Sequence, residues 1–515
     1  MAIIGKTYLP RRVLQVFLLV FVVMLFISKD SFLHDLQNHY DSAWFFMCGK
    51  AWMNGMVPYV DFADSKGPLL WLIYGVGYLF TPHSYVGVFW LSCVAWTATL
   101  LLAWRSAAIL LQNEDGAFVA MLPVMLAGLC FVVHNETRAE DFAMPAVMFV
   151  VFALCRAMSG KAQKGWVDVL LGASVAATLL VKYNITLMLF PFVVLVFLVN
   201  WKRSEARIGR SLAIALAGAL IVLVPFVVYF MMKGCLDDFL NEYFLVAARS
   251  TNDEDLFANT LHSILSPSGI YALILFSFST VCLAKLMPCC KKLALLCCAW
   301  LFLVCAVNSR PYYFDIHSPF VLFLGVVAVK RFKVLQTRRA AAVATTFVAA
   351  FLIASNLYSH DLRHPDYGDF FTQDNASRRE FYSIECMLSQ VPKARVVYAA
   401  GVNFGVAAEA LPACKYFALQ WNFNEAMLRQ QIDACRNGKA DFAIVQKEFT
   451  QYIETLKKAG WQAFDFSEGP YKVVLMSRHR FAKQHDCCRV TNLDVMLKRQ
   501  PQFCNDGIIN PKQRQ

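Results

Sequence analysis

Apolar runs of membrane-spanning length recur along most of this chain and constrain its fold more than any other feature. Eleven runs occur at residues 13–27, 85–104, 117–133, 143–155, 166–181, 185–200, 211–232, 268–286, 293–307, 316–329 and 340–355. Each approaches the roughly 20 residues that a helix needs to cross a hydrocarbon core about 30 Å thick. Backbone polar groups must be satisfied within the bilayer, so the runs predict a polytopic α-helical membrane protein of about 11 to 13 spans.

The composition agrees with a membrane protein. Of the 515 residues, 58% are hydrophobic and 16% are charged, whereas soluble proteins carry roughly 25% charged residues. The net charge of +12 does not indicate nucleic-acid binding, because the basic residues concentrate in short loops between apolar runs. Apolar runs end near residue 358. We therefore predict a membrane module over residues 1–357 and an extracytoplasmic α/β domain over residues 358–515.

Loop charge predicts the topology. The basic loops are residues 156–165, 201–210, 289–292 and 330–339. Since Lys and Arg favour cytoplasmic loops, these loops and the N-terminus are expected inside, and the C-terminal domain outside. The loop 29–66 and the segment 134–142 are then both outside, so an even number of crossings must separate them. The intervening run 67–81 is short, and we expect it to be shallow, re-entrant or strongly tilted.

The outer loop 29–66 carries closely spaced charges beside the next apolar run. Asp41 begins a stretch with helical spacing of Trp, Phe and Met, which favours a helix along the membrane surface. Asp61, Asp64 and Lys66 follow within "PYVDFADSKGPLLW", residues 58–71. A plain alternative for Asp41 is that it only stabilises the N-terminus of its helix.

Three further charged clusters fall at span ends on the same predicted face. They comprise Glu136, Arg138, Glu140 and Asp141; Lys182; and Arg310, Tyr312, Tyr313 and His317. Each has a structural alternative: a solvated loop, a lysine that reaches the interface, or an aromatic belt. Gathered on one face, carboxylates could take a proton from a hydroxyl or hold a divalent cation, and the cations could bind phosphate.

The segment Gly55 to Trp71 reads G-x-x-P-Y-x-D-F-x-D-x-K-G-P-L-L-W. It resembles the first outer loop of bacterial GT-C glycosyltransferases of the protein-mannosyltransferase and aminoarabinose-transferase type. Those enzymes have an acidic residue in a juxtamembrane helix and a K-P-P-L-x-x-W sequence at the next span. Here Gly67 replaces the first proline of that motif. The resemblance covers about residues 10–330.

The resemblance implies an inverting enzyme of the bacterial inner membrane. Such enzymes transfer a sugar from a polyprenyl-phosphate carrier to a glycolipid, polysaccharide or protein acceptor on the outer, periplasmic face. Asp41 would be the general base, with Glu140 or Asp141 as a second catalytic acid. These three carboxylates are also the candidates for a divalent cation, whose requirement stays open.

Lys66 would hold the carrier phosphate in such an enzyme, helped by Lys182 and Arg310. The full candidate substrate-binding set is Asp61, Asp64, Lys66, Glu136, Arg138, Lys182, Arg310, Tyr312, Tyr313 and His317. A transporter or flippase of lipid-linked glycans is the alternative function, although such proteins usually show internal repeats and charges near the bilayer midplane.

The C-terminal part changes its pattern to alternating strands and helices. Expected strands are 394–401, 440–446 and 471–478, and expected helices are 424–438 and 450–460. This order predicts a small α/β domain. Six cysteines in this part permit disulfides without fixing their pairing. They are Cys386, Cys414, Cys435, Cys487, Cys488 and Cys504.

Overall fold

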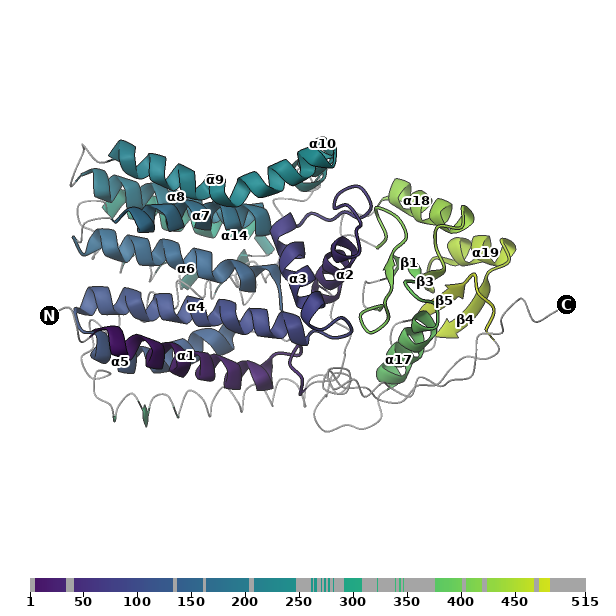
Figure 1. The fold of residues 1–515 in the computed structure, drawn as a ribbon, viewed down its shortest axis with the longest axis horizontal. Helices are drawn as coiled ribbons and strands as arrows, with labels where there is room; N and C mark the ends of the chain where they lie inside the picture. Colours follow the sequence, from purple (N-terminus) through teal and green to yellow (C-terminus); the bar gives the residue numbers. More distant parts are fainter. Residues whose placement is uncertain are drawn as a thin grey trace.

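A helical bundle and a small α/β domain make up the described part of the chain (Figure 1). The computed structural model describes residues 5–33, 41–132, 137–160, 164–202, 208–246, 291–307, 376–400, 404–418, 424–466 and 472–481, with isolated positions between 261 and 346. The predicted fold class is confirmed. The predicted runs 268–286, 316–329 and 340–355 lie almost entirely outside the described residues.

Long apolar helices run side by side in the bundle (Figure 1). They are α1 (Gly5–Ile27), α4 (Val86–Leu111), α5 (Glu114–Val132), α6 (Ala139–Met158), α7 (Gly165–Val181), α8 (Tyr183–Trp201), α9 (Ile208–Met232) and α14 (Lys291–Val307). Among the described residues, five helices are long and apolar enough to cross a membrane, namely α1, α4, α6, α8 and α9. Large apolar side chains on α9, such as Leu216 and Ile221, are exposed, as expected for a helix that faces lipid.

Two shorter helices, α2 (Asp41–Met53) and α3 (Pro68–Phe80), lie between the bundle and the α/β domain (Figure 1). The 13 residues of α3 extend only about 20 Å, which is too short to cross the membrane upright. This length is consistent with the expectation that 67–81 is not an ordinary span, whose depth in the membrane stays a prediction. α4 and α5 supply an even number of helices before α6. The pair packs closely, because a Cβ atom on Gly49 would lie 2.4 Å from the backbone nitrogen of Gly75.

The α/β domain contains a five-stranded mixed sheet in the order β2-β1-β3-β5-β4. Its strands are β1 (Arg395–Ala399), β2 (Leu411–Pro412), β3 (Phe442–Gln446), β4 (Gln462–Phe466) and β5 (Val473–Ser477), and its helices are α17 (Ala376–Ser389), α18 (Glu425–Arg436) and α19 (Thr450–Lys458). Strand β1 is parallel to β2 and β3, and β5 is antiparallel to β3 and β4. The three expected strands and two expected helices are confirmed, while β2, β4 and α17 were not predicted.

The cysteines of this domain show no disulfide among the described positions: Cys386, Cys414 and Cys435 are thiols. The other cysteines considered for disulfides, Cys487, Cys488 and Cys504, lie beyond the described residues. So does the predicted boundary between residues 357 and 358, and the division into two domains at that point stays a prediction.

The α/β domain rests on α2 and on the loop that follows it. Trp44 packs its ring 5.9 Å from that of Phe417, and the backbone nitrogen of Ala63 donates to Lys415 O at 3.0 Å. His83 Nδ1 lies 2.9 Å from Ala407 O. Residues on both sides of Lys66 in the chain are therefore in contact with the C-terminal domain.

A buried turn at residues 404–408, called the docking turn below, makes the deepest of these contacts. Lys50 of α2 donates its ammonium to the carbonyl oxygens of Gly405 and Ala408, the latter at 2.9 Å. Glu385 of α17 accepts from the backbone N–H groups of Gly405, Val406 and Ala408. Both side chains are buried. They replace bulk water as the hydrogen-bond partners of these backbone groups.

Candidate active site

Candidate site residues from distant segments meet where the bundle faces α2 and α3. Glu140, at the start of α6, and Lys182, between α7 and α8, form an ion pair of 2.5 Å. Both side chains are about 5% exposed. Because a lone buried charge is costly, each of these residues stabilises the other in its charged form. The structure therefore joins two clusters that the sequence placed 42 residues apart.

The backbone around Lys66 is held next to the Glu140–Lys182 ion pair. The nitrogen of Gly67 donates to Val181 O at 3.0 Å, and Tyr59 donates its hydroxyl to Lys66 O at 2.9 Å. The Lys66 ammonium lies 3.9 Å from the Asp64 carboxylate. That separation exceeds a hydrogen bond, so Asp64 attracts and orients the ammonium without a direct hydrogen bond.

The contact at Gly67 explains its departure from the K-P-P motif. A Cβ atom at this position would lie 2.0 Å from Leu180 O and 2.9 Å from the Tyr243 hydroxyl. Its φ of −84° and ψ of 157° suit proline as well as glycine. Space and the N–H bond to Val181 O, rather than backbone conformation, therefore require glycine here.

Asp141 caps the start of α6. Its carboxylate accepts from the backbone nitrogen of Arg138 at 2.7 Å and from Trp96 Nε1 at 2.9 Å. This arrangement satisfies a helix-terminal N–H group, as capping residues do. Glu140 and Asp141 thus differ in role although they are adjacent: Glu140 neutralises Lys182, and Asp141 fixes the turn that precedes α6.

Asp41 is the first residue of α2 and is half-buried. Its neighbour Ser42 is buried and lies 3.3 Å from the Tyr74 hydroxyl of α3. Tyr74 donates in turn to Thr137 O at 2.8 Å. These bonds hold the start of α2, the middle of α3 and the segment before α6 together, and they bring Asp41 to the end of the bundle where Glu140 lies.

Asp30, which was not predicted from the sequence, is a buried carboxylate in the same network. Its Oδ2 accepts from Thr137 N at 3.0 Å and lies 3.5 Å from Ser42 Oγ. The available signal was an acidic residue directly after the first apolar run. Lys50 was missed as well, because a lysine in a surface helix usually indicates a solvated face.

Asp61 has a local structural role: its carboxylate accepts from Val57 N at 2.6 Å and closes the turn after α2. It also lines a cavity at the domain contact. Its predicted role in substrate binding stays a prediction. Five predicted binding residues lie outside the described residues, namely Glu136, Arg310, Tyr312, Tyr313 and His317.

No group of three or more His, Cys, Asp or Glu residues in the described ranges is arranged to hold a metal ion. The Glu140 carboxylate accepts a hydrogen bond from Lys182, and the Asp141 carboxylate accepts from Arg138 N and Trp96 Nε1. The assignment of a divalent cation to Asp41, Glu140 and Asp141 therefore stays an untested prediction.

Residues 65–230 match the family model described as dolichyl-phosphate-mannose-protein mannosyltransferase. No curated protein sequence matches the chain. The matched range includes Lys66, Glu140, Asp141 and Lys182, so it covers the described cluster apart from Asp41.

Most of the chain resembles crystal structures of ArnT from Cupriavidus metallidurans. The structure bound to undecaprenyl phosphate aligns with a TM-score of 0.61 and the apo structure with 0.55. Both are 11% identical in sequence, and both alignments cover 92% of this chain and 98% of the ArnT chain. The predicted resemblance is confirmed: this is a multi-pass membrane protein with the ArnT-like GT-C fold, and its residues 65–230 match the mannosyltransferase family model.

Proposed function

We propose that the protein transfers a sugar from a polyprenyl-phosphate carrier to an acceptor at the outer face of the bacterial inner membrane, with inversion at the anomeric carbon. The observation that supports this most is the convergence of Lys66, Lys182 and Glu140 at the end of the bundle beside α2. The fold shared with ArnT, which was crystallised with undecaprenyl phosphate, supports a lipid-phosphate ligand.

Lys66 binds the carrier phosphate in this proposal. Its backbone is held by Tyr59 and, through Gly67, by the end of α7, so the ammonium starts from a fixed position. The departing phosphate gains negative charge as the glycosidic bond breaks. A fixed cation stabilises that charge more in the transition state than in the ground state, which is the condition for catalysis. Lys182 follows Val181, which accepts the hydrogen bond from Gly67. Glu140 neutralises the charge of Lys182 in the absence of a phosphate.

Asp41 acts as the general base. An acceptor hydroxyl is a weak nucleophile, and a carboxylate within hydrogen-bond distance accelerates its attack by taking the proton. Asp41 is half-buried at the start of α2, whereas Glu140 and Asp141 are buried. This difference favours Asp41 as the proton acceptor and leaves Glu140 and Asp141 to position the site.

The test uses purified protein in nanodiscs supplied with lipid extracted from bacterial envelopes. Free polyprenyl phosphate, which is released when the sugar is transferred, is measured by mass spectrometry. We expect Asp41→Asn to lower the release of polyprenyl phosphate by about 100-fold or more, the usual contribution of a general base. The variant should still bind polyprenyl phosphate. Glu425→Gln, an exposed carboxylate on α18, is the control and should behave as wild type.

Lys66→Ala should weaken binding of polyprenyl phosphate in the same preparation. Full release by Asp41→Asn would contradict the role of Asp41, and unchanged carrier affinity of Lys66→Ala would contradict that of Lys66. Wild-type protein that moves the glycolipid across the bilayer without releasing the carrier would instead be a flippase.

A further inference from the structure

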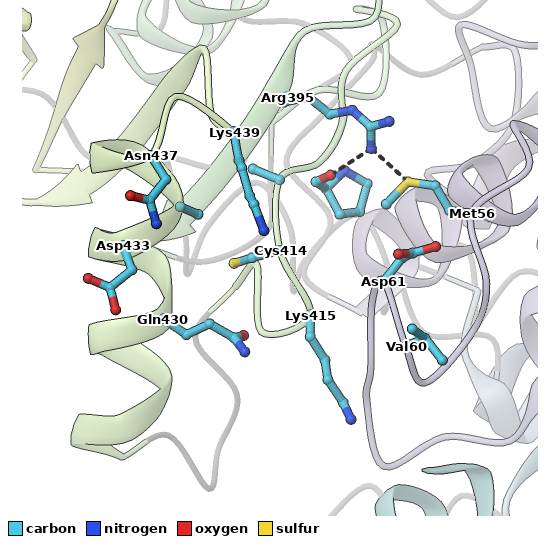
Figure 2. Close-up of a pocket in the computed structure, with 13 residues that line it drawn as sticks. Met56, Val60, Asp61, Arg395, Cys414, Lys415, Gln430, Asp433, Asn437 and Lys439 are labelled. Carbon is cyan, nitrogen blue, oxygen red and sulfur yellow. Dashed lines mark hydrogen bonds between the residues drawn. The ribbon is translucent and has the colours of Figure 1, made fainter. Parts of the chain in front are cut away.

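A cavity of about 520 Å³ lies where the loop after α2 meets the α/β domain (Figure 2). Residues 56–61 contribute one wall, and β1, β2 and α18 with its following turn contribute the other. None of the residues that line it belongs to the cluster of Lys66, Glu140 and Lys182. Its volume lies within the range of about 300–1,000 Å³ that small-molecule sites occupy.

Basic side chains reach this cavity from three positions, Arg395, Lys415 and Lys439. Lys415 is neutralised by ion pairs with Glu242 at 2.8 Å and Asp238 at 3.4 Å. Across the described residues, no ion pair joins Arg395 or Lys439 to a carboxylate. The cavity therefore offers two positive charges to a ligand.

Arg395 is held in place by uncharged partners. Its Nη1 donates to Met56 Sδ and to Pro412 O, both at 3.0 Å (Figure 2). These contacts fix one nitrogen of the planar guanidinium against the cavity wall. Its other N–H groups keep the fork geometry that suits the oxygens of a phosphate or a carboxylate.

The rest of the polar lining suits hydroxyl groups. Gln430 and Asn437 contribute amides, and Asp61 and Asp433 contribute carboxylates. The Gln430 carbonyl oxygen accepts from Tyr416 N at 3.2 Å, which leaves its NH₂ group as a donor. Carboxylates repel a bare anion but accept hydrogen bonds from hydroxyls. A ligand that carries both an anionic group and several hydroxyls matches this lining better than inorganic phosphate does.

We propose that this cavity binds a saccharide that carries a phosphate or a carboxylate. Arg395 and Lys439 bind its anionic group, and Asp61, Asp433 and Gln430 bind its hydroxyls. The turn that forms one wall continues directly to Lys66, whose carbonyl accepts from Tyr59. The assignment of this saccharide as part of the acceptor rests on the proposed function, whereas the binding itself does not.

The test is a titration of the detergent-solubilised full chain with glucose 1-phosphate, followed by saturation-transfer NMR, with glucose and inorganic phosphate as separate probes. We expect glucose 1-phosphate to bind more tightly than either. Arg395→Gln should weaken it by about tenfold or more, as expected for loss of a hydrogen bond to a charged group. Lys439→Gln, at an exposed position, should weaken it in the same direction. Arg429→Gln is the control, since it removes a charge from α18 outside the cavity.

Equal affinity of wild type and both cavity variants would overturn the proposal, as would absence of binding. Inorganic phosphate that binds as tightly as glucose 1-phosphate would overturn the saccharide assignment. If glucose 1-phosphate binds as expected but the protein releases no polyprenyl phosphate from its donor, the result supports the binding site in the cavity. It contradicts the assignment of the bound saccharide as part of the acceptor.

Discussion

Lys50 and Glu385 bind the same buried turn from two sides. The Lys50 ammonium donates to carbonyl oxygens of the turn, and the Glu385 carboxylate accepts from N–H groups of the turn. Lys50 belongs to α2 and Glu385 to α17, 335 residues later in the chain by their numbers. The docking turn therefore connects the helix that starts with Asp41 to the C-terminal domain through charge-assisted hydrogen bonds, which are stronger than neutral ones. The position of α2 depends on the domain that packs on it.

Lys50→Met should destabilise the protein by about 3 kcal/mol or more, because it removes the donor of two buried hydrogen bonds from a charged group. The substitution leaves two carbonyl groups of the docking turn without their donor and the Glu385 carboxylate without a nearby cation. Thermal unfolding in detergent measures the loss. Lys447→Met, at an exposed lysine after β3, should change little. A Lys50→Met protein as stable as this control would show that the docking turn does not stabilise the domain contact.

The contribution of Lys50 to stability should rise with pH above neutrality. Burial lowers the pKa of Lys50 from 10.5 to about 7, against the negative charge of Glu385, which raises it. Between these pH values the unfolded chain binds a proton that the folded protein has released. Stability relative to Lys50→Met is therefore constant below about pH 7 and increases from there toward pH 10.5, by at most about 1.4 kcal/mol per pH unit.

Melting temperatures of wild type and Lys50→Met between pH 6 and pH 10 check this dependence. In Glu385→Gln, which lacks the neighbouring negative charge, the rise should begin at lower pH. Parallel profiles of wild type and Lys50→Met would contradict the lowered pKa.

Gly67→Pro restores the K-P-P motif and should nevertheless destabilise the protein by more than about 3 kcal/mol, because overpacking against backbone cannot relax easily. Proline would place carbon atoms against Leu180 O and would remove the N–H bond to Val181 O. Gly67→Ala keeps the N–H group and tests the steric part alone. Gly209→Ala is the control, since a Cβ atom there meets nothing within 4 Å.

Size-exclusion profiles and thermal unfolding of these three variants provide the measurement. A Gly67→Pro protein as stable as wild type would contradict the requirement for glycine at this position, because α7 could then move away from the loop without loss of stability.

Lys182→Met should cost about 3–5 kcal/mol because it leaves the Glu140 carboxylate buried without its cation. Adding Glu140→Gln should recover much of that loss, since both charges are then gone. Sugar transfer should stay low in the double variant, because the cation beside Lys66 is still missing. A double-mutant cycle of melting temperatures together with carrier release measures both effects. Strictly additive losses of stability would show that the two side chains do not depend on each other.

The apolar runs predicted the helices well, since the runs 185–200 and 211–232, which form most of α8 and α9, admit few other structures in a membrane. Periodicity also predicted β1, β3 and β5, whose residues are almost all buried. Strand β4 was missed because alternate residues are exposed and the segment carries Asp465. Its place at the sheet edge, beside β5 alone, needs less apolar surface.

The candidate site was only partly predictable for a different reason. Charge at span ends indicated Glu140, Lys182 and Lys66, but the pairing of Glu140 with Lys182 depends on how α6 and α7 pack. Lys50 illustrates the limit: its sequence context is that of a surface residue, and its partners come from a turn more than 350 positions away. Contacts at such separation leave no periodic trace in the sequence.

The docking turn also orders events during biosynthesis. α2 leaves the ribosome early, while the carbonyl groups that receive the Lys50 ammonium are made some 355 residues later. Until then, the ammonium must stay hydrated at the membrane surface, and α2 cannot settle into its final place. A nascent chain would thus already contain Lys66 and Lys182, the lysines proposed to bind the carrier, before the helix that starts with Asp41 becomes fixed by residues 404–408.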